Sequence, residues 1–190
     1  MTAGQRIKRV VISVGLLIGL TGVFSGGLYE YLHLTGNVGV VEQGVCYRSG
    51  QLDASQLNQI IVKDGIRSIL NLRGASPNAG WYNSELSVSA SRHVVHYDYP
   101  LSANRFVTPA QDEEILHIIE NAPKPILIHC QAGSDRTGLV SALYRYTHGA
   151  TLETSRNELS LRYGHFPYLW SETDAMDKSF SAYVQMSAKK

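Results

Sequence analysis

Apolar residues in this chain are grouped into short segments that alternate between two kinds. Compact apolar runs, which are typical of buried strands, lie at residues 45–48, 66–72, 94–101 and 126–129. Segments that can form helices lie between and after them, at residues 54–64, 79–90, 109–122 and 137–146. The sequence therefore predicts strands and helices in alternation.

Capping and breaking residues support these boundaries. Asp53 is a good N-cap for the first helix, and Gly65 ends it. Thr108 followed by Pro109 is a strong helix start, and Pro123 marks the end of that helix. Residues 151–162 and 172–187 are predicted to add helices at the C-terminus.

Alternating strands and helices predict an α/β fold with a mostly parallel central sheet flanked by helices. In such folds, ligands bind beyond the carboxyl ends of the strands, where the following helices begin. The strand that ends at His129 and the helix that starts near Thr137 place one loop at that position.

The N-terminus has a different pattern from the rest of the chain. Arg6, Lys8 and Arg9 precede an apolar run from residue 10 to about residue 28, close to the ~20 residues that cross a bilayer. Positive charge stays on the cytoplasmic side, so the following residues are expected on the other side. A cleaved signal peptide is the competing interpretation.

The chain is therefore divided into four predicted parts. These are a cytoplasmic basic segment at 1–9, a transmembrane anchor or uncleaved signal at 10–31, a glycine-rich linker at 32–44, and one folded domain at 45–190. The anchor would make this a single-pass membrane protein whose domain is extracytoplasmic, or periplasmic in a bacterium.

Charge and cysteine content exclude some classes of function. The 190 residues carry 17 basic and 16 acidic side chains, so the whole chain lacks the basic character that nucleic-acid binding requires. The two cysteines, Cys46 and Cys130, form no CxxC pair, so neither a metal site nor a dithiol motif is predicted. Cys46 is best interpreted as a small core residue.

The loop after the 126–129 strand carries the chemistry. Cys130 and Arg136 are six positions apart, and backbone N–H groups of 131–136 can surround an oxyanion at the start of the next helix. Gly133 permits the tight curvature, and the Arg136 guanidinium can bind two phosphate oxygens. This positive environment favours a thiolate at Cys130, which would attack a phosphate monoester and form a phosphocysteine.

The segment His-Cys-x-x-Gly-x-x-Arg-Thr at 129–137 resembles the signature of protein tyrosine and dual-specificity phosphatases, in particular their compact bacterial and fungal-type members. Residues 47–51, 69–73, 100–103 and 163–165 resemble further landmarks of that subgroup. The resemblance covers roughly residues 45–185.

The resemblance implies a dual-specificity phosphatase-like fold and a role for each residue of the loop. Cys130 would be the nucleophile, Arg136 would bind phosphate, Thr137 would hydrogen-bond the leaving thiolate, and His129 would brace the loop through backbone groups. Phosphate would also be bound by the loop residues that lie between the nucleophile and the arginine, namely Gln131, Ala132, Gly133 and Ser134. No metal or organic cofactor is implied.

The general acid is left open between two carboxylates. Asp98 lies 32 residues before Cys130, and Asp135 lies inside the phosphate loop. Asp112 falls within the next helix and fits a helix-start charge better. Arg48 and Arg73 could reach the mouth of the site or make structural ion pairs.

The substrate would be a phosphorylated protein carrying phosphotyrosine, phosphoserine or phosphothreonine, or else a membrane lipid phosphate. The loop has no lysine, which disfavours inositol phosphates. Two other functions compete with the phosphatase: a phosphate-binding module with little turnover, and a sulfur-transfer or arsenate-reducing enzyme.

Overall fold

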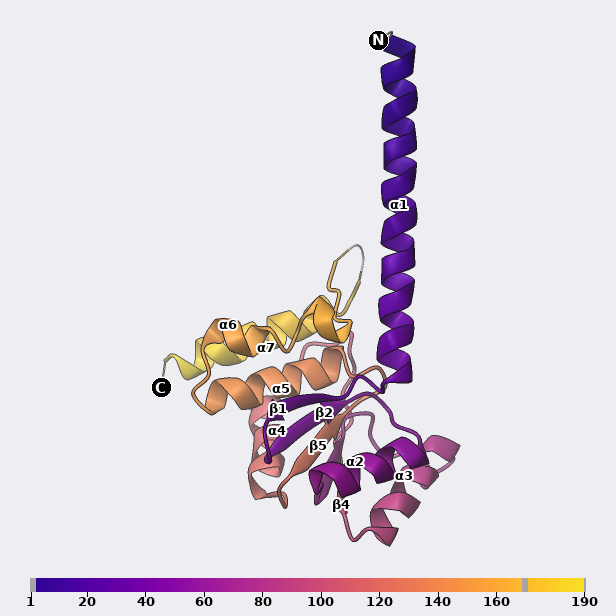
Figure 1. Ribbon diagram of the computed structural model, residues 1–190. Helices are drawn as coiled ribbons and strands as arrows, with labels where there is room; N and C mark the ends of the chain where they lie inside the picture. The colour runs from indigo at the N-terminus through magenta and orange to yellow at the C-terminus, as the bar shows by residue number, and fades with distance from the viewer. Residues whose placement is uncertain (1–2, 169–170, 190) are drawn as a thin grey trace.

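The computed structural model describes residues 3–168 and 171–189. Its domain is built on a five-stranded sheet with the strand order β1-β2-β5-β3-β4 (Figure 1). The strands are β1 (Gly39–Glu42), β2 (Cys46–Ser49), β3 (Ser68–Asn71), β4 (Val95–Asp98) and β5 (Ile126–His129). β1 is antiparallel to β2, and the other neighbouring pairs are parallel. The predicted α/β fold with a mostly parallel central sheet is confirmed.

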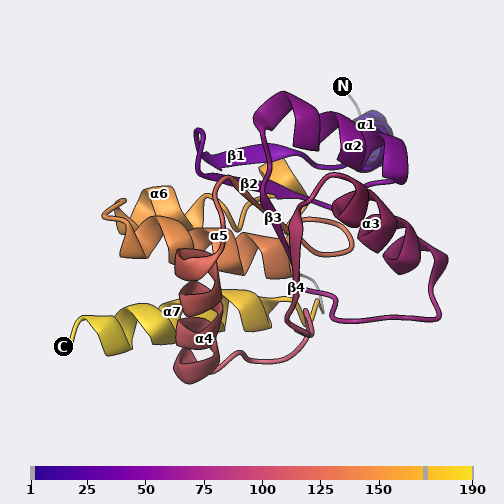
Figure 2. The ribbon, with the colours of Figure 1, turned by 90° about the horizontal axis from the view of Figure 1, so that it is seen from below.

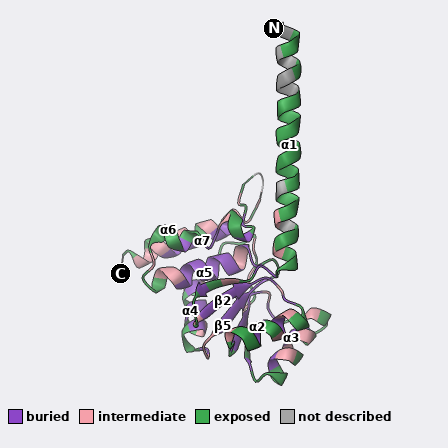
Figure 3. Cartoon of the chain, in the orientation of Figure 1, coloured by how far each residue is buried: buried purple, intermediate pink, exposed green. Residues whose placement is uncertain are grey.

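Helices cover both faces of this sheet (Figures 1 and 2). One face packs against α2 (Ala54–Asp64) and α3 (Gly80–Ser91). The other side holds α4 (Pro109–Asn121), α5 (Asp135–Thr147), α6 (Leu152–Arg156), the short 3₁₀ helix η1 (Leu161–Tyr163) and α7 (Asp174–Ser187). Figure 3 shows that burial is concentrated in the strands and in α5.

Alternating side chains of the strands build two cores. Ile69 and Leu127 join the cluster that contains the α2 residues, whereas Leu70, Ile126 and Ile128 join the cluster on the α4 and α5 side. A strand covered on both faces has no polar face, so it appears in the sequence as a continuous apolar run.

The predicted helix starts are confirmed at atomic detail. Asp53 and Gln56 form a capping box at α2, and Thr108 and Gln111 form another at α4. Gly65 ends α2 in the left-handed conformation, with φ 67°.

Two predicted elements differ from the structure. The 94–101 run contains a strand only at Val95–Asp98, and the helix expected at 151–162 is the five-residue α6 followed by η1. In addition, the expected linker at 32–44 contains β1, so the sheet begins before residue 45. β1 is an edge strand in which only Val41 is buried, so it lacks the apolar run that identifies the other strands.

The N-terminal helix α1 (Ala3–Leu34) projects away from the domain (Figure 1). Its stretch Ile12–Leu34 has 23 residues, and it is long and apolar enough to cross a membrane. No residue of this stretch for which the structure describes the side chain is buried. Signal sequences share this length and composition.

Candidate active site

The loop that follows β5 lies at the carboxyl edge of the sheet. The parallel register aligns His129 with Ser49 of β2 and with Asn71 of β3, so all three strands end beside this loop. The loop residues 130–134 then lead into α5. Cys130 is 2% exposed, and its Sγ accepts a hydrogen bond from the Gly133 N–H at 3.3 Å. The predicted nucleophile therefore lies at the base of the loop.

Three successive carbonyl groups of this loop are held by donors from outside it. The Gln51 N–H donates to the Gln131 carbonyl at 2.9 Å. The Asn37 amide donates to the Ala132 carbonyl at 2.9 Å, and the Arg48 guanidinium donates to the Gly133 carbonyl at 2.5 Å.

These bonds fix which way the peptide planes face. In a trans peptide the C=O and the next N–H point in opposite directions, so a carbonyl turned outward turns the following N–H inward. The N–H groups of residues 132–134 thus face the Cys130 side of the loop. Together with the free N–H groups in the first turn of α5, they suit an oxyanion such as phosphate.

Gly133 is required where this loop turns. Its φ is 77°, and a Cβ there would lie 2.6 Å from the Gly50 nitrogen and 2.7 Å from the Ser49 carbonyl carbon. Side chains rarely adopt this backbone conformation, and no side-chain atom fits in this space. The sequence-based expectation for Gly133 agrees with this geometry.

Arg136 lies in the first turn of α5 and is anchored on one side. Its Nη1 donates to the carbonyls of Leu101 at 3.2 Å and Leu72 at 3.4 Å. Its Nε is buried and has no hydrogen-bond partner among the described residues. A buried cationic donor of this kind is suited to a phosphate oxygen. Thr137 donates instead to the Ser49 carbonyl at 3.4 Å.

His129 braces the loop, and it does so together with a residue that the sequence analysis did not identify. Its Nδ1 lies 3.2 Å from the Cys130 carbonyl, and its Nε2 lies 3.1 Å from Oε1 of Glu85. Through its two ring nitrogens, His129 therefore joins the base of the loop to Glu85.

Glu85 is the buried centre of a wider network. Besides His129, it accepts hydrogen bonds from His96 at 2.8 Å and from Gln51 at 2.7 Å. Burial raises its pKa, but the hydrogen bonds from His129, His96 and Gln51 outweigh burial and hold that pKa well below its ordinary value. Glu85 lies on α3, a helix without a clear apolar stripe, and no feature of the sequence indicates that it is buried.

Arg48 and Arg73, for which the sequence allowed either a place at the mouth of the site or a structural ion pair, make different contacts. Arg48 is fully buried, and its guanidinium bonds Glu158 at 2.6 Å as well as the loop. It also lies 3.6 Å from the centre of the Tyr163 ring. Arg73 is partly exposed, donates to Gln51 at 3.0 Å and stacks on Trp81 at 3.6 Å. Arg48 therefore supports the loop, and Arg73 is placed at its mouth.

Asp98 is held at the end of β4. One carboxylate oxygen accepts from the Asn71 amide at 2.7 Å, and the other accepts from the Tyr82 hydroxyl at 2.5 Å. Both oxygens are therefore engaged by side chains of neighbouring elements.

Asp135 begins α5 and is paired with a histidine. Its Oδ1 lies 2.7 Å from His165 Nδ1, and its Oδ2 accepts from the Ser134 hydroxyl at 3.1 Å. The other His165 nitrogen lies 2.9 Å from Asp177. Burial opposes charge on this ring, but the two carboxylates outweigh burial and raise the His165 pKa to about 9.

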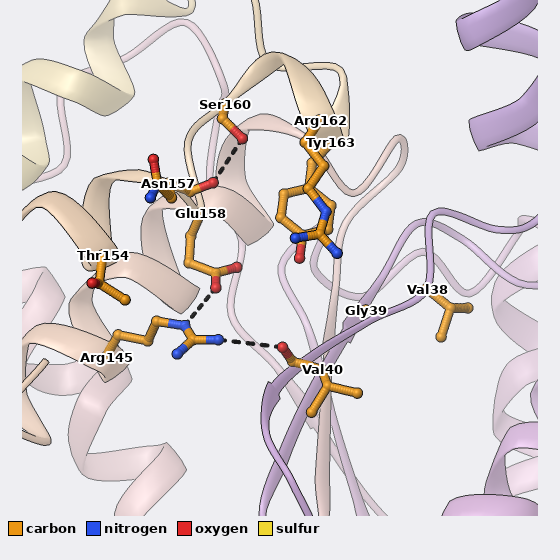
Figure 4. Close-up of a pocket in the computed structure, with 10 residues that line it drawn as sticks. All are labelled: Val38, Gly39, Val40, Arg145, Thr154, Asn157, Glu158, Ser160, Arg162 and Tyr163. Carbon is orange, nitrogen blue, oxygen red and sulfur yellow. Dashed lines mark hydrogen bonds and ion pairs between the residues drawn. The ribbon is translucent and has the colours of Figure 1, made fainter.

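Two cavities of the domain differ in whether the loop lines them. One, of about 460 Å³, is lined by loop residues Gln131, Ala132 and Ser134 together with Arg73 and Trp81. The other, of about 650 Å³, contains none of the residues 130–137. Figure 4 shows the residues that line it, among them Arg145, which bridges Glu158 and the Val40 carbonyl. The smaller cavity therefore marks the mouth of the site.

Comparison with known protein families gives a match that spans most of the domain. A model described as the tyrosine phosphatase family matches residues 27–161. The chain belongs to the tyrosine phosphatase family. It is a cysteine-based phosphatase, which confirms the expectation from the 129–137 signature. The match also includes the segment 32–44, where the structure shows β1.

Individual relatives from this family agree with that assignment. The chain is 32% identical over 111 residues to OCA1 of Mycosarcoma maydis, which its name places among the tyrosine-protein phosphatases. That alignment covers 57% of this chain and 68% of the relative.

Solved structures share the fold at lower identity. The core catalytic domain of the PP-IP phosphatase SIW14 from S. cerevisiae has a TM-score of 0.62 and 22% identity, covering 80% of this chain and 91% of that one. TpbA from P. aeruginosa has a TM-score of 0.60 and 19% identity, with the same coverage. A TpbA variant was crystallised with pTyr, at a TM-score of 0.60 and 18% identity.

Proposed function

We propose that this tyrosine phosphatase relative hydrolyses phosphate monoesters through a phosphocysteine on Cys130. The observation that carries the proposal is the set of outward carbonyls of residues 131–133, which turns the loop N–H groups toward the nucleophile. Phosphate would be bound by these N–H groups and by Arg136.

The proposed reaction has two steps. The Cys130 thiolate attacks phosphorus, an S–P bond forms, and the P–O bond to the leaving group breaks with its electron pair staying on oxygen. Water then attacks the phosphocysteine, loses a proton, and releases inorganic phosphate with regeneration of the thiolate. The amide groups and Arg136 stabilise the negative charge of both transition states.

The substrate class follows from the leaving group. An alkyl leaving oxygen needs a proton, but Asp98 and Asp135 both use their oxygens as acceptors. An aryl oxide leaves without full protonation. We therefore propose phosphotyrosine in proteins as the preferred substrate, ahead of phosphoserine, phosphothreonine and alkyl lipid phosphates. The TpbA complex with pTyr agrees with this choice.

Trapping the intermediate tests this function. The full chain in detergent is mixed with ³²P-labelled phosphotyrosine peptide and quenched in acid within milliseconds. We expect protein-bound label in the wild type and none in Cys130→Ser, which should still bind phosphate. Wild-type binding without turnover would instead identify a phosphate-binding module, and turnover retained by Cys130→Ser would exclude the mechanism.

The position of the enzyme in the cell is part of the proposal. We propose that α1 anchors the chain as a single-pass membrane protein, with residues 1–9 in the cytoplasm and the phosphatase domain across the membrane. Three basic residues precede the apolar stretch, and no Lys or Arg occurs from residue 10 to residue 47.

A further inference from the structure

The end of α1 lines the cavity at the mouth of the phosphate loop. Leu32, His33 and Gly36 line the cavity of about 460 Å³ together with the loop residues Gln131 and Ala132. The apolar helix and the phosphate loop therefore share one cavity, although they are about one hundred residues apart in sequence.

Hydrogen bonds fix the helix end to the site. The Gly36 carbonyl accepts from the Gly50 N–H at 2.8 Å. The buried Asn37 amide bonds both the Ala132 carbonyl at 2.9 Å and the Tyr163 carbonyl at 2.8 Å. A flexible tether would let the domain sit at any height above a membrane, but these bonds exclude free movement between the two parts.

The distance between membrane and site is short as a result. Leu34 ends the stretch that is apolar enough to cross a bilayer, and Asn37 is three residues further on. Three residues span at most ~11 Å of extended chain. The phosphate loop would thus lie close to the bilayer surface, in the region of the lipid head groups.

A second segment leaves the domain on the same side as α1 (Figure 1). It follows η1 and carries two exposed aromatic residues, Phe166 and Tyr168, whose ring centres are 5.2 Å apart. Tyr31, near the end of α1, is also exposed. Aromatic side chains of this kind are enriched at the membrane–water interface, because they have an apolar body and, in tyrosine, a polar tip.

We propose that the face of the domain that carries the phosphate loop rests on the bilayer surface, held by α1 and by an aromatic contact of Phe166 and Tyr168. The substrate is then a phosphotyrosine in the juxtamembrane segment of a membrane protein. This inference rests on the proposed function. It adds the location of the substrate, which would be at the membrane surface. A lipid phosphate monoester would also lie at the right depth, but its alkyl leaving group needs a proton donor, and the oxygens of Asp98 and Asp135 are already engaged by Asn71, Tyr82, Ser134 and His165.

Tethered substrates test the placement. The full chain is reconstituted in phosphatidylcholine vesicles and given one phosphotyrosine peptide in three forms: free, joined to a lipid anchor by two residues, and joined to the anchor by thirty residues. We expect the short tether to be hydrolysed at least ten-fold faster than the free peptide at equal bulk concentration, and faster than the long tether. A free peptide hydrolysed as fast as the short-tethered one would overturn the proposal.

A second measurement, with a lipid substrate, distinguishes a phosphorylated peptide from a lipid phosphate as the substrate. Vesicles of the same composition with a few per cent phosphatidic acid should release phosphate at least ten-fold more slowly than the short-tethered peptide. Faster release from phosphatidic acid would replace the peptide by a lipid as the substrate and overturn the proposal. p-Nitrophenyl phosphate is measured in parallel, because its loss would mean that the proposed function itself fails.

Spin labels test the aromatic contact directly. In a Cys130→Ser background, a nitroxide at Tyr168→Cys should be more accessible to oxygen than to a water-soluble nickel complex in vesicles. The matched control is Leu152→Cys, an exposed apolar position beyond the far end of α5, which should show the opposite ratio. Equal ratios at the two positions would remove Phe166 and Tyr168 from the membrane contact.

A kinetic control completes the test. The double variant Phe166→Ser/Tyr168→Ser should lower the ratio of tethered to free peptide rates several-fold, whereas Leu152→Ser should leave this ratio unchanged. An unchanged ratio in the double variant would mean that the aromatic residues do not orient the site.

Discussion

At the scale of single residues, the site depends on side chains outside the signature as much as on those within it. In the proposed mechanism, Cys130 is the nucleophile, Gly133 allows the loop to turn, and Arg136 binds the phosphate. Asn37 and Arg48, from the N-terminal part of the chain, turn the peptide groups that would bind the oxyanion. Removing a member of either group should therefore reduce turnover.

Arg136→Lys is the sharpest test of the phosphate ligand. Lysine keeps the charge but replaces a planar fork with a single ammonium group. Loss of one transition-state donor costs ~10²–10³ in kcat, so we expect a fall of that order toward p-nitrophenyl phosphate. A change confined to KM would mean that Arg136 assists only substrate binding.

Asp98→Asn and Asp135→Asn test the absence of a dedicated acid. Each variant is assayed with an aryl phosphate and an alkyl phosphate. A general acid contributes ~10²–10⁴ and acts mainly on the poor leaving group. We expect the ratio of aryl to alkyl rates to stay within about three-fold of wild type in both. A hundred-fold loss on the alkyl substrate alone would identify that aspartate as the acid.

Asp112 should reduce stability as pH rises. Both of its carboxylate oxygens are buried without a hydrogen-bond partner among residues 3–168 and 171–189, and burial raises its pKa from 3.8 to about 8. Between about pH 4 and pH 8 the folded protein retains a proton that the unfolded chain has lost, so this group makes folding less favourable as pH increases.

Asp112→Asn should therefore raise the melting temperature at pH 8 and change it little at pH 4. The expected gain in the free energy of unfolding at pH 8 is of order a few kcal/mol. Thermal melts followed by circular dichroism at both pH values provide the measurement, with the exposed Glu172→Gln as control. A gain of equal size at pH 4 would contradict an effect of ionisation.

At the scale of elements, the site lies where three strands end. Two segments that the sequence did not place there, the end of α1 and the start of β1, lie at the same edge. β2, β3 and β5 end at the same edge because they are parallel. The end of α1 and the start of β1 then cross this edge, and the residues between them contact the phosphate loop. The segment 32–44 is therefore part of the site rather than a spacer.

Asn37→Gly tests this contact. Asn37 has φ 50°, which glycine tolerates, so the variant removes two hydrogen bonds without adding backbone strain. Each bond contributes ~0.5–1.5 kcal/mol, and we expect unfolding to become easier by about 1–3 kcal/mol. Activity toward p-nitrophenyl phosphate should fall about ten-fold, since a less rigid loop loses preorganised N–H donors.

The control for Asn37→Gly is Asn58→Ala. Asn58 is a half-buried residue of α2 that accepts one bond from Arg92 at 2.7 Å, and within the described part of the chain it makes no hydrogen bond with the phosphate loop. This variant should leave activity unchanged. If Asn37→Gly lowers stability without lowering activity, the contact is structural only.

At the scale of the whole molecule, α1 and the phosphate loop belong to one rigidly bonded unit. The long exposed helix leaves the domain at the edge that carries the site (Figure 1). Under the proposed anchoring, the membrane that holds α1 would therefore set the orientation of the active site.

The orientation across the membrane gives a separate prediction. Alkaline phosphatase fused after Lys190 should be active in a bacterial host, and it should sediment with membranes, because the basic N-terminal residues stay in the cytoplasm. A reporter that requires the cytoplasm, fused at the same site, should be inactive. Activity of the second reporter alone would reverse the topology, and a soluble active fusion would indicate cleavage of α1.

The sequence by itself determined the fold class, most helix starts and the chemical centre. Fully buried parallel strands appear as apolar runs, and capping residues act through the chain next to them, so both are local signals. The 129–137 segment is also local, because the strand end, the tight loop and the helix start that carry Cys130 and Arg136 follow one another along the chain.

Only the tertiary structure decided what surrounds this centre. Asn37, Arg48 and Glu85 reach the loop from elements that are 44 or more residues away, and nothing in their neighbouring sequence indicates the contact. β1 was missed because an edge strand with one buried residue has no apolar pattern. The roles of Asp98 and Asp135 depend on hydrogen-bond partners from other elements, and these partners exist only once the sheet and helices have packed.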